Sequence, residues 1–134
     1  MKFGVAVKGI IRKDGKILVV KRADHDDHKP GLWETVGGGI DEGEMPQDAL
    51  KREIMEEVGI NVSIKHPFNV FTFTKDNGES KIGITFLCDY INGEVALSDE
   101  HSEYKWIDPQ EFSSMESIPS LHNEIKDYIE KHAQ

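Results

Sequence analysis

The chain has 134 residues, 37% of them hydrophobic and 31% charged, which suits one soluble domain able to bury its own core. Its net charge of −9 argues against a broad nucleic-acid-binding surface, because proteins that track phosphate backbones are usually basic on one face. No apolar run approaches the roughly 20 residues of a membrane helix, and the N-terminal residues lack a signal-peptide core. Cys88 is the only cysteine, so nothing indicates an oxidising compartment and we expect a cytoplasmic protein. From the charge and the hydropathy we expect that it binds neither nucleic acid nor membrane.

The first predicted element is a β-hairpin. Apolar residues over 3–11 and 16–22 are separated by Asp14-Gly15, a pair that favours a tight hairpin turn. A polar loop and a short apolar segment then lead to three consecutive glycines at residues 37–39. We expect these glycines to form a turn with positive φ angles, in which the backbone approaches a ligand and offers it carbonyl oxygens.

A helix is predicted over residues 46–58. Pro46 suits the first turn, where its missing N–H is not needed, and Asp48 favours the positive end of the helix dipole. Gly59 is suited to cap the C-terminus. Apolar residues at helical spacing form one stripe that we expect to pack on a sheet: Leu50, Ile54 and Val58.

The second half of the chain predicts further strands and a closing helix. Strand-rich runs occupy residues 62–74, 80–91 and 103–107, with a turn over residues 76–78 between the first two. Residues 118–132 carry apolar side chains at helical spacing. The pattern predicts a single α/β domain over residues 1–134, with a mixed β-sheet and helices on its faces.

Three carboxylates and a guanidinium crowd one face of the first predicted helix. Glu53 lies three residues from Glu56 and four from Glu57, so their Cβ atoms are about 5–6 Å apart. Such a cluster repels itself unless cations intervene, and a hard divalent cation such as Mg²⁺ prefers oxygen ligands. The alternative is a solvated helix face, on which Arg52 and Lys51 relieve the repulsion.

The glycines and the acidic helix together form a longer motif. Gly38, then five residues, Glu44, then seven residues, and the run REIMEEVGI over 52–60 match G-x5-E-x7-R-E-U-x-E-E-x-G-U, where U is aliphatic. This is the Nudix box, and the chain resembles Nudix hydrolases of the MutT type. Segments outside the box, including LVVKR, GLWE and EHSEYKWID, also resemble that group.

The resemblance implies an α/β/α sandwich and Mg²⁺- or Mn²⁺-dependent hydrolysis of a nucleoside diphosphate linked to a further group. By analogy, the cation ligands would be Glu53, Glu56, Glu57 and the Gly38 carbonyl oxygen. Arg52 would orient a glutamate through a charge-assisted hydrogen bond. Glu44 would not bind the cation itself but would support its ligands by connecting the loop to the helix.

Other positions carry weaker signals. Family members often have one more glutamate downstream, as metal ligand or base; Glu103 is preferred over Glu100 because it leads into a strand. Arg22 is a candidate phosphate contact, and Trp33 a candidate platform for the base, although core packing is an alternative for the tryptophans. The stretch ADHDDH over residues 23–28 fits no standard zinc site and is expected to be a mobile loop near the site entrance. The family usually has proline where this chain has Val36.

The substrate is inferred by elimination. Sequence marks of ADP-ribose-, dinucleoside-polyphosphate- and NADH-cleaving members are absent, which leaves nucleoside triphosphates, oxidised ones included, cleaved to a nucleoside monophosphate and pyrophosphate. Alternatives are an ADP-ribose or dinucleotide pyrophosphatase and a non-catalytic module that senses a nucleotide. A prenyl-diphosphate isomerase would need a reactive cysteine, whereas Cys88 lies in an apolar strand. The partner is thus a small nucleotide, and a homodimer is left open.

Overall fold

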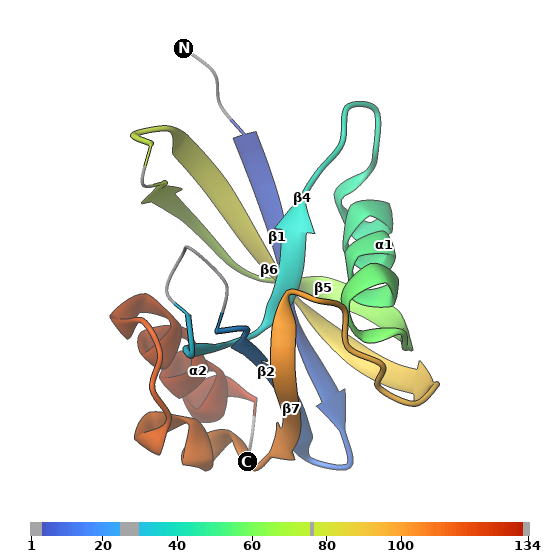
Figure 1. Cartoon of the computed structure of the whole chain (residues 1–134), viewed down its shortest axis with the longest axis vertical. Coiled ribbons are helices and arrows are strands. Elements are labelled where there is room, and N and C mark those ends of the chain that lie inside the picture. Colours follow the sequence, from blue (N-terminus) through green and yellow to red (C-terminus); the bar gives the residue numbers. More distant parts are fainter. Residues whose placement is uncertain (1–3, 25–29, 76, 133–134) are drawn as a thin grey trace.

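Over the residues described, seven strands form one mixed sheet in the computed structural model, with a helix on each of its faces (Figure 1). The structure describes residues 4–24, 30–75 and 77–132. The strands are β1 (Gly4–Lys13), β2 (Lys16–Arg22), β3 (Trp33–Glu34), β4 (Val36–Gly39), β5 (Asn61–Thr74), β6 (Ser80–Asn92) and β7 (His101–Ile107). The helices are α1 (Pro46–Val58), the short 3₁₀ helix η1 (Pro109–Ser114) and α2 (Pro119–Lys131).

The main path through the sheet runs β3-β2-β1-β6-β5, with β4 paired to β1 and β7 paired to β2. The predicted hairpin is confirmed, since β1 and β2 are antiparallel and Asp14 and Gly15 at the turn have φ angles of 52° and 79°. Strand β6 runs parallel to β1 and antiparallel to β5. The sheet is therefore mixed, as predicted, because a crossover through α1 separates β1 from β6 in the chain.

The three consecutive glycines correct one prediction. Residues 37–39 do not form a turn with positive φ angles; they lie in β4, which is antiparallel to β1. Their need for glycine is spatial. A Cβ atom at Gly37 would collide with the Val7 carbonyl oxygen, and one at Gly38 would collide with the Glu53 carboxylate. The glycines allow close approach through their missing side chains rather than through an unusual backbone angle.

Helix α1 has the predicted bounds and caps. Pro46 occupies its first turn, and Gly59 at the C-terminus has a left-handed φ of 70°. The Gly59 N–H donates to the carbonyl oxygens of Ile54 and Met55, which satisfies two of the last acceptors of the helix. The apolar stripe is fully buried, as predicted: Leu50, Ile54 and Val58.

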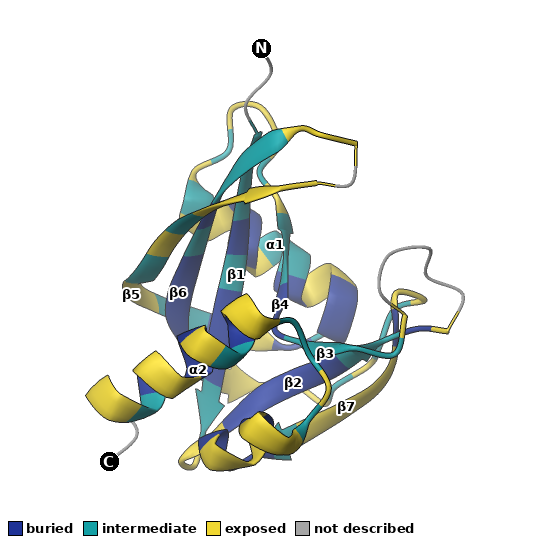
Figure 2. Ribbon diagram, turned by 90° about the vertical axis from the view of Figure 1, so that its left-hand side faces the viewer, coloured by how far each residue is buried: buried dark blue, intermediate teal, exposed yellow. Residues whose placement is uncertain are grey.

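Two apolar clusters lie on opposite faces of the sheet (Figure 2). The first packs α1 on the sheet and includes Val7, Leu18, Val36, Leu50, Ile54 and Cys88, with Trp106 against it. The second packs α2 and η1 and includes Ile10, Val19, Leu87, Phe112, Leu121 and Ile125, with Trp33 against it. Burial also raises the pKa of Cys88 to about 12, so this thiol is not a nucleophile. These layers form the expected α/β/α sandwich.

Some predicted features differ in extent or fall outside the described residues. Strand β7 begins at His101, two residues earlier than predicted, and α2 begins one residue later and ends one residue earlier than predicted. The predicted loop over 23–28 lies outside the described residues from His25 onward, as does Asp76 in the predicted turn. Within the described part of the chain, no helix has the length and hydropathy needed to cross a membrane.

Candidate active and metal site

Arg52, on α1, is the centre of a hydrogen-bond network that joins the helix to β4 and to the loop before the helix. Its Nε and Nη2 atoms donate to the two oxygens of Glu44, each at 2.9 Å, in a bidentate pair. Nη1 donates to Glu53 at 3.0 Å and to Glu56 at 3.3 Å, and Nη2 also reaches the Gly39 carbonyl oxygen at 3.2 Å. The hydrogen bonds from Arg52, helped by the Asp41 N–H, lower the pKa of Glu44 to about 2. Arg52 therefore fixes the helix against the loop and β4.

Glu53 is held between this network and the glycine strand. Its carboxylate lies over Gly38, in the space that any side chain at that position would occupy. Burial raises the pKa of Glu53 although the hydrogen bond and charge of Arg52 act in the opposite direction, and the nearby charges of Glu56 and Glu100 raise it further. Arg52 therefore does not fully compensate for the burial of Glu53 and for the acids around it. A bound cation would favour the ionised form of this carboxylate.

Glu57 lies deeper in the site, at the C-terminal end of α1. It is 5% exposed, and its Oε2 atom has no hydrogen-bond partner among the described residues. Burial, with the adjacent carboxyl groups of Glu100, Glu53 and Glu34, raises its pKa to about 9. Without a cation, the helix thus brings a buried acid against other acids, an arrangement that is unfavourable unless a positive charge lies between them.

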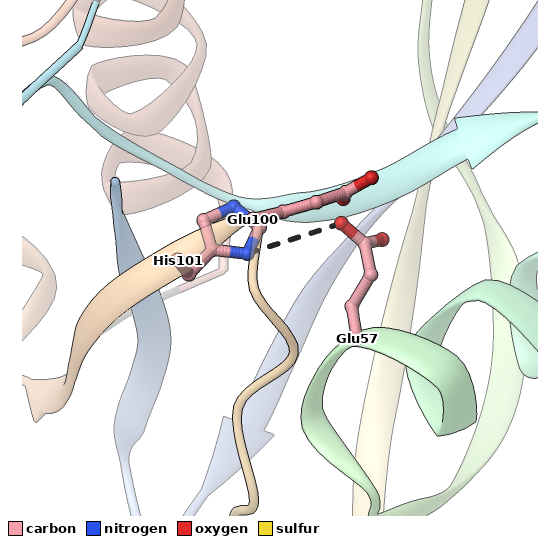
Figure 3. A group of neighbouring side chains, drawn as sticks. All are labelled: Glu57, Glu100 and His101. Atoms are coloured by element: carbon pink, nitrogen blue, oxygen red, sulfur yellow. Dashed lines mark ion pairs between the residues drawn. The ribbon is translucent and has the colours of Figure 1, made fainter. Parts of the chain in front are cut away.

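Glu57, Glu100 and His101 converge on one point (Figure 3). One carboxylate oxygen from each glutamate and one ring nitrogen of His101 lie within 4.8 Å of one another. Glu57 lies at the end of α1, Glu100 directly precedes β7, and His101 is the first residue of β7. The view shows the two carboxylates near each other, with the imidazole facing Glu57. Three potential ligand atoms at this spacing, two of them oxygens, are suited to share one divalent cation.

The structure changes the choice between the two downstream glutamates. Glu100 lies beside Glu57, whereas the Glu103 carboxylate contacts Lys21 Nζ at 3.3 Å on the exposed face of β7. The sequence preference for Glu103 relied on its place in a strand. Regular alternation would place Glu103 on the side of His101, but the register shifts between Lys21 and Arg22, with Ser102 as the extra residue in β7. Glu103 therefore lies opposite Lys21 instead. The geometry therefore favours Glu100, and the choice between the two glutamates as metal ligand or base stays a prediction.

Sequence reasoning missed His101 and Glu34. The His101 Nε2 atom lies 2.8 Å from the Glu34 carboxylate, and the Glu34 carboxylate also accepts from Arg22 Nε at 3.1 Å. Burial would raise the pKa of Glu34, but the hydrogen bond from His101 and the charges of Lys8 and Arg22 lower it overall. Glu34 and His101 lie in the family-like segments GLWE and EHSEYKWID, but the sequence did not show that they meet, because their contacts depend on which strands pair with β2.

The two predicted substrate contacts lie in different places. Arg22 is linked to the cluster through Glu34. Trp33 packs on the apolar cluster beneath α2, on the other face of the sheet from α1, with Lys105 Nζ 5.2 Å from the centre of its ring. The roles proposed for Arg22 and Trp33 in holding a nucleotide stay predictions.

Comparisons with known proteins agree with this fold and with the sequence motif. The NUDIX domain family profile matches residues 2–131. The nucleoside triphosphatase NudI of Salmonella arizonae is 32% identical over 114 residues, which cover 78% of this chain and 81% of that protein. The Escherichia coli NudI is 34% identical over 113 residues, 76% of this chain and 79% of its own length. The crystal structure of a MutT protein from Methanosarcina mazei has a TM-score of 0.85 and 25% identity, and covers 98% of this chain and 96% of its own. The chain therefore belongs to the NUDIX family and is a Nudix hydrolase.

Proposed function

We propose that this protein hydrolyses a nucleoside triphosphate, oxidised bases included, to a nucleoside monophosphate and pyrophosphate, with Mg²⁺ or Mn²⁺ as cofactor. The observation that carries the proposal is a group of three carboxylates at the end of α1 and beside the glycine strand. Glu57 is buried and its Oε2 atom has no hydrogen-bond partner among the described residues, Glu53 is half-buried, and Glu100 is exposed. The similarity to two nucleoside triphosphatases supports the choice of substrate.

The residues present fit a hard divalent cation. The donor set is rich in carboxylate oxygens, and the unpartnered Oε2 of Glu57 is the kind of atom that a cation would satisfy. Glu53, Glu56, Glu57 and Glu100, with the Gly38 carbonyl oxygen, are the residues that would hold it. When bound, the cation would neutralise phosphate charge and activate both the phosphate and the attacking water.

The chain's own groups then have separate tasks. Arg52 holds Glu53 in place and is itself held by Glu44, so the ligand geometry is fixed before substrate arrives. Gly38 leaves the space in which the Glu53 carboxylate lies. Arg22 is proposed to contact a phosphate. Trp33 packs on the other face of the sheet from α1, and its contact with the base stays a prediction from the sequence.

The products test the proposal. A panel of nucleoside triphosphates is incubated with Mg²⁺, and orthophosphate is measured with and without added inorganic pyrophosphatase. Cleavage between the α and β phosphorus atoms gives an orthophosphate signal only when the pyrophosphatase is present, together with a nucleoside monophosphate peak. Direct release of orthophosphate with a diphosphate product would contradict the proposed bond. Cleavage of ADP-ribose alone would contradict the proposed substrate, and full turnover after exhaustive chelation would contradict the metal requirement.

A further inference from the structure

The imidazole of His101 lies between two acids, yet among the residues that the structure describes only one of its nitrogens has a hydrogen-bond partner. Its side chain is 2% exposed. Nε2 is 2.8 Å from a Glu34 oxygen, whereas Nδ1 is buried without a partner and lies 3.9 Å from Glu57 Oε1. Figure 3 shows this nitrogen directed at the Glu57 carboxylate, with Glu100 beside it. A buried polar atom without a partner is costly, so this nitrogen calls for an explanation.

The contact with Glu34 indicates which nitrogen carries hydrogen. An ionised carboxylate can only accept, so the short contact requires a hydrogen on Nε2. In a neutral ring, Nδ1 then presents a lone pair. The distance of 3.9 Å from Nδ1 to Glu57 is longer than an N–H···O hydrogen bond, so Glu57 is not the acceptor of a hydrogen on that nitrogen.

The orientation of the ring is fixed by tertiary contacts. Strand β2 pairs with β7 so that Arg22 lies opposite His101, with a register shift next to Arg22. Arg22 also donates to Glu34, so a second residue holds the acid that orients the imidazole. A histidine whose far nitrogen donates to a carboxylate is the usual arrangement around a metal-bound imidazole.

We propose that Nδ1 of His101 is a direct ligand of the cation held by Glu57 and Glu100, with Glu34 orienting the ring from behind. The inference rests on the proposed cation dependence. An imidazole ligand suits transition metals, whereas Mg²⁺ prefers oxygen ligands. The site of this protein therefore selects Mn²⁺ over Mg²⁺ more strongly than carboxylates alone would.

Pulsed electron paramagnetic resonance of Mn²⁺ bound to the wild-type protein tests the ligand directly, without substrate and without turnover. We expect a ¹⁴N coupling of a directly bound imidazole, which changes to a ¹⁵N coupling when the histidines are labelled with ¹⁵N. Bound Mn²⁺ without a histidine coupling would overturn the proposal while leaving the proposed function intact. Failure to bind Mn²⁺ while Mg²⁺ binds in calorimetry would likewise overturn the proposal alone, and failure to bind either cation would overturn both.

Variants then assign the signal. His101→Asn should remove the coupling and weaken Mn²⁺ binding about 10- to 100-fold in calorimetry, with a smaller loss for Mg²⁺. The matched control is His122→Asn, because His122 lies on α2 and contacts the Met115 carbonyl oxygen. Glu34→Gln retains the ring but permits the other tautomer, so it should weaken the coupling and the Mn²⁺ preference. A coupling that persists in His101→Asn, or that His122→Asn removes, would overturn the assignment.

Discussion

Replacing Glu57 by glutamine should stabilise the metal-free protein while abolishing its activity. Glu57 is 5% exposed, and its pKa rises from the ordinary value of 4.5 to about 9. The folded protein thus keeps a proton on this carboxyl that the unfolded chain releases above about pH 4.5. Because the folded state binds more protons, the contribution of Glu57 to stability falls as pH rises and levels off near pH 9.

The size of the effect follows from the same shift. One pKa unit corresponds to about 1.4 kcal/mol, so keeping Glu57 protonated at pH 7 costs the folded state at most about 3 kcal/mol. Glutamine has nearly the same volume and no charge, so the Glu57→Gln variant avoids this cost. For a domain of this size, about 3 kcal/mol corresponds to a rise in Tm of roughly 10 °C.

Thermal unfolding of chelator-treated protein at pH 5, 7 and 8.5 measures the effect. The gain in Tm from Glu57→Gln should be small at pH 5 and largest at pH 8.5. Saturating Mg²⁺ or Mn²⁺ should raise the Tm of the wild type much more than the Tm of Glu57→Gln. The kcat of Glu57→Gln should be orders of magnitude lower than that of the wild type. Glu56→Gln is the matched control on the same helix, because the Glu56 side chain is 57% exposed and its loss should change stability by less than about 1 kcal/mol. An equal gain at all three pH values, or a loss of stability, would refute the reasoning.

Three further predictions concern neighbouring positions. Gly38→Ala should lower kcat at least about 10-fold, because its Cβ displaces the Glu53 carboxylate. Gly39→Ala should leave kcat within about twofold, because nothing lies within 4 Å of a Cβ there. Equal losses of kcat in steady-state kinetics would contradict the crowding argument. Glu44→Gln should lower kcat about 10- to 100-fold with the fold intact, since it weakens the bidentate pair with Arg52; an unchanged kcat would exclude a supporting role. Glu100→Gln should weaken Mn²⁺ binding at least about 10-fold by calorimetry and Glu103→Gln should not, and the reverse order would restore the sequence preference.

The sequence by itself determined the local elements of this protein and the family motif. Asp14 and Gly15 favour one tight turn, Pro46 and Gly59 mark the two ends of α1, and the apolar spacing between them fixes which side of the helix is buried. These features depend on residues close together in the chain, whose backbone preferences and periodicity act locally. The box spacing likewise indicated Glu53, Glu56 and Glu57 as one group.

Only the tertiary structure decided how distant segments complete the site. Glu100, rather than Glu103, lies beside Glu57 because β7 pairs with β2 in one particular register. The same pairing places His101 between Glu34 and Glu57. The glycines of β4 turned out to be extended, since their requirement comes from the Val7 backbone and the Glu53 carboxylate rather than from a local turn. Strand pairing is set by the burial of both sheet faces across the whole chain, and a one-residue slip would reverse every side chain, so these contacts follow from the complete fold.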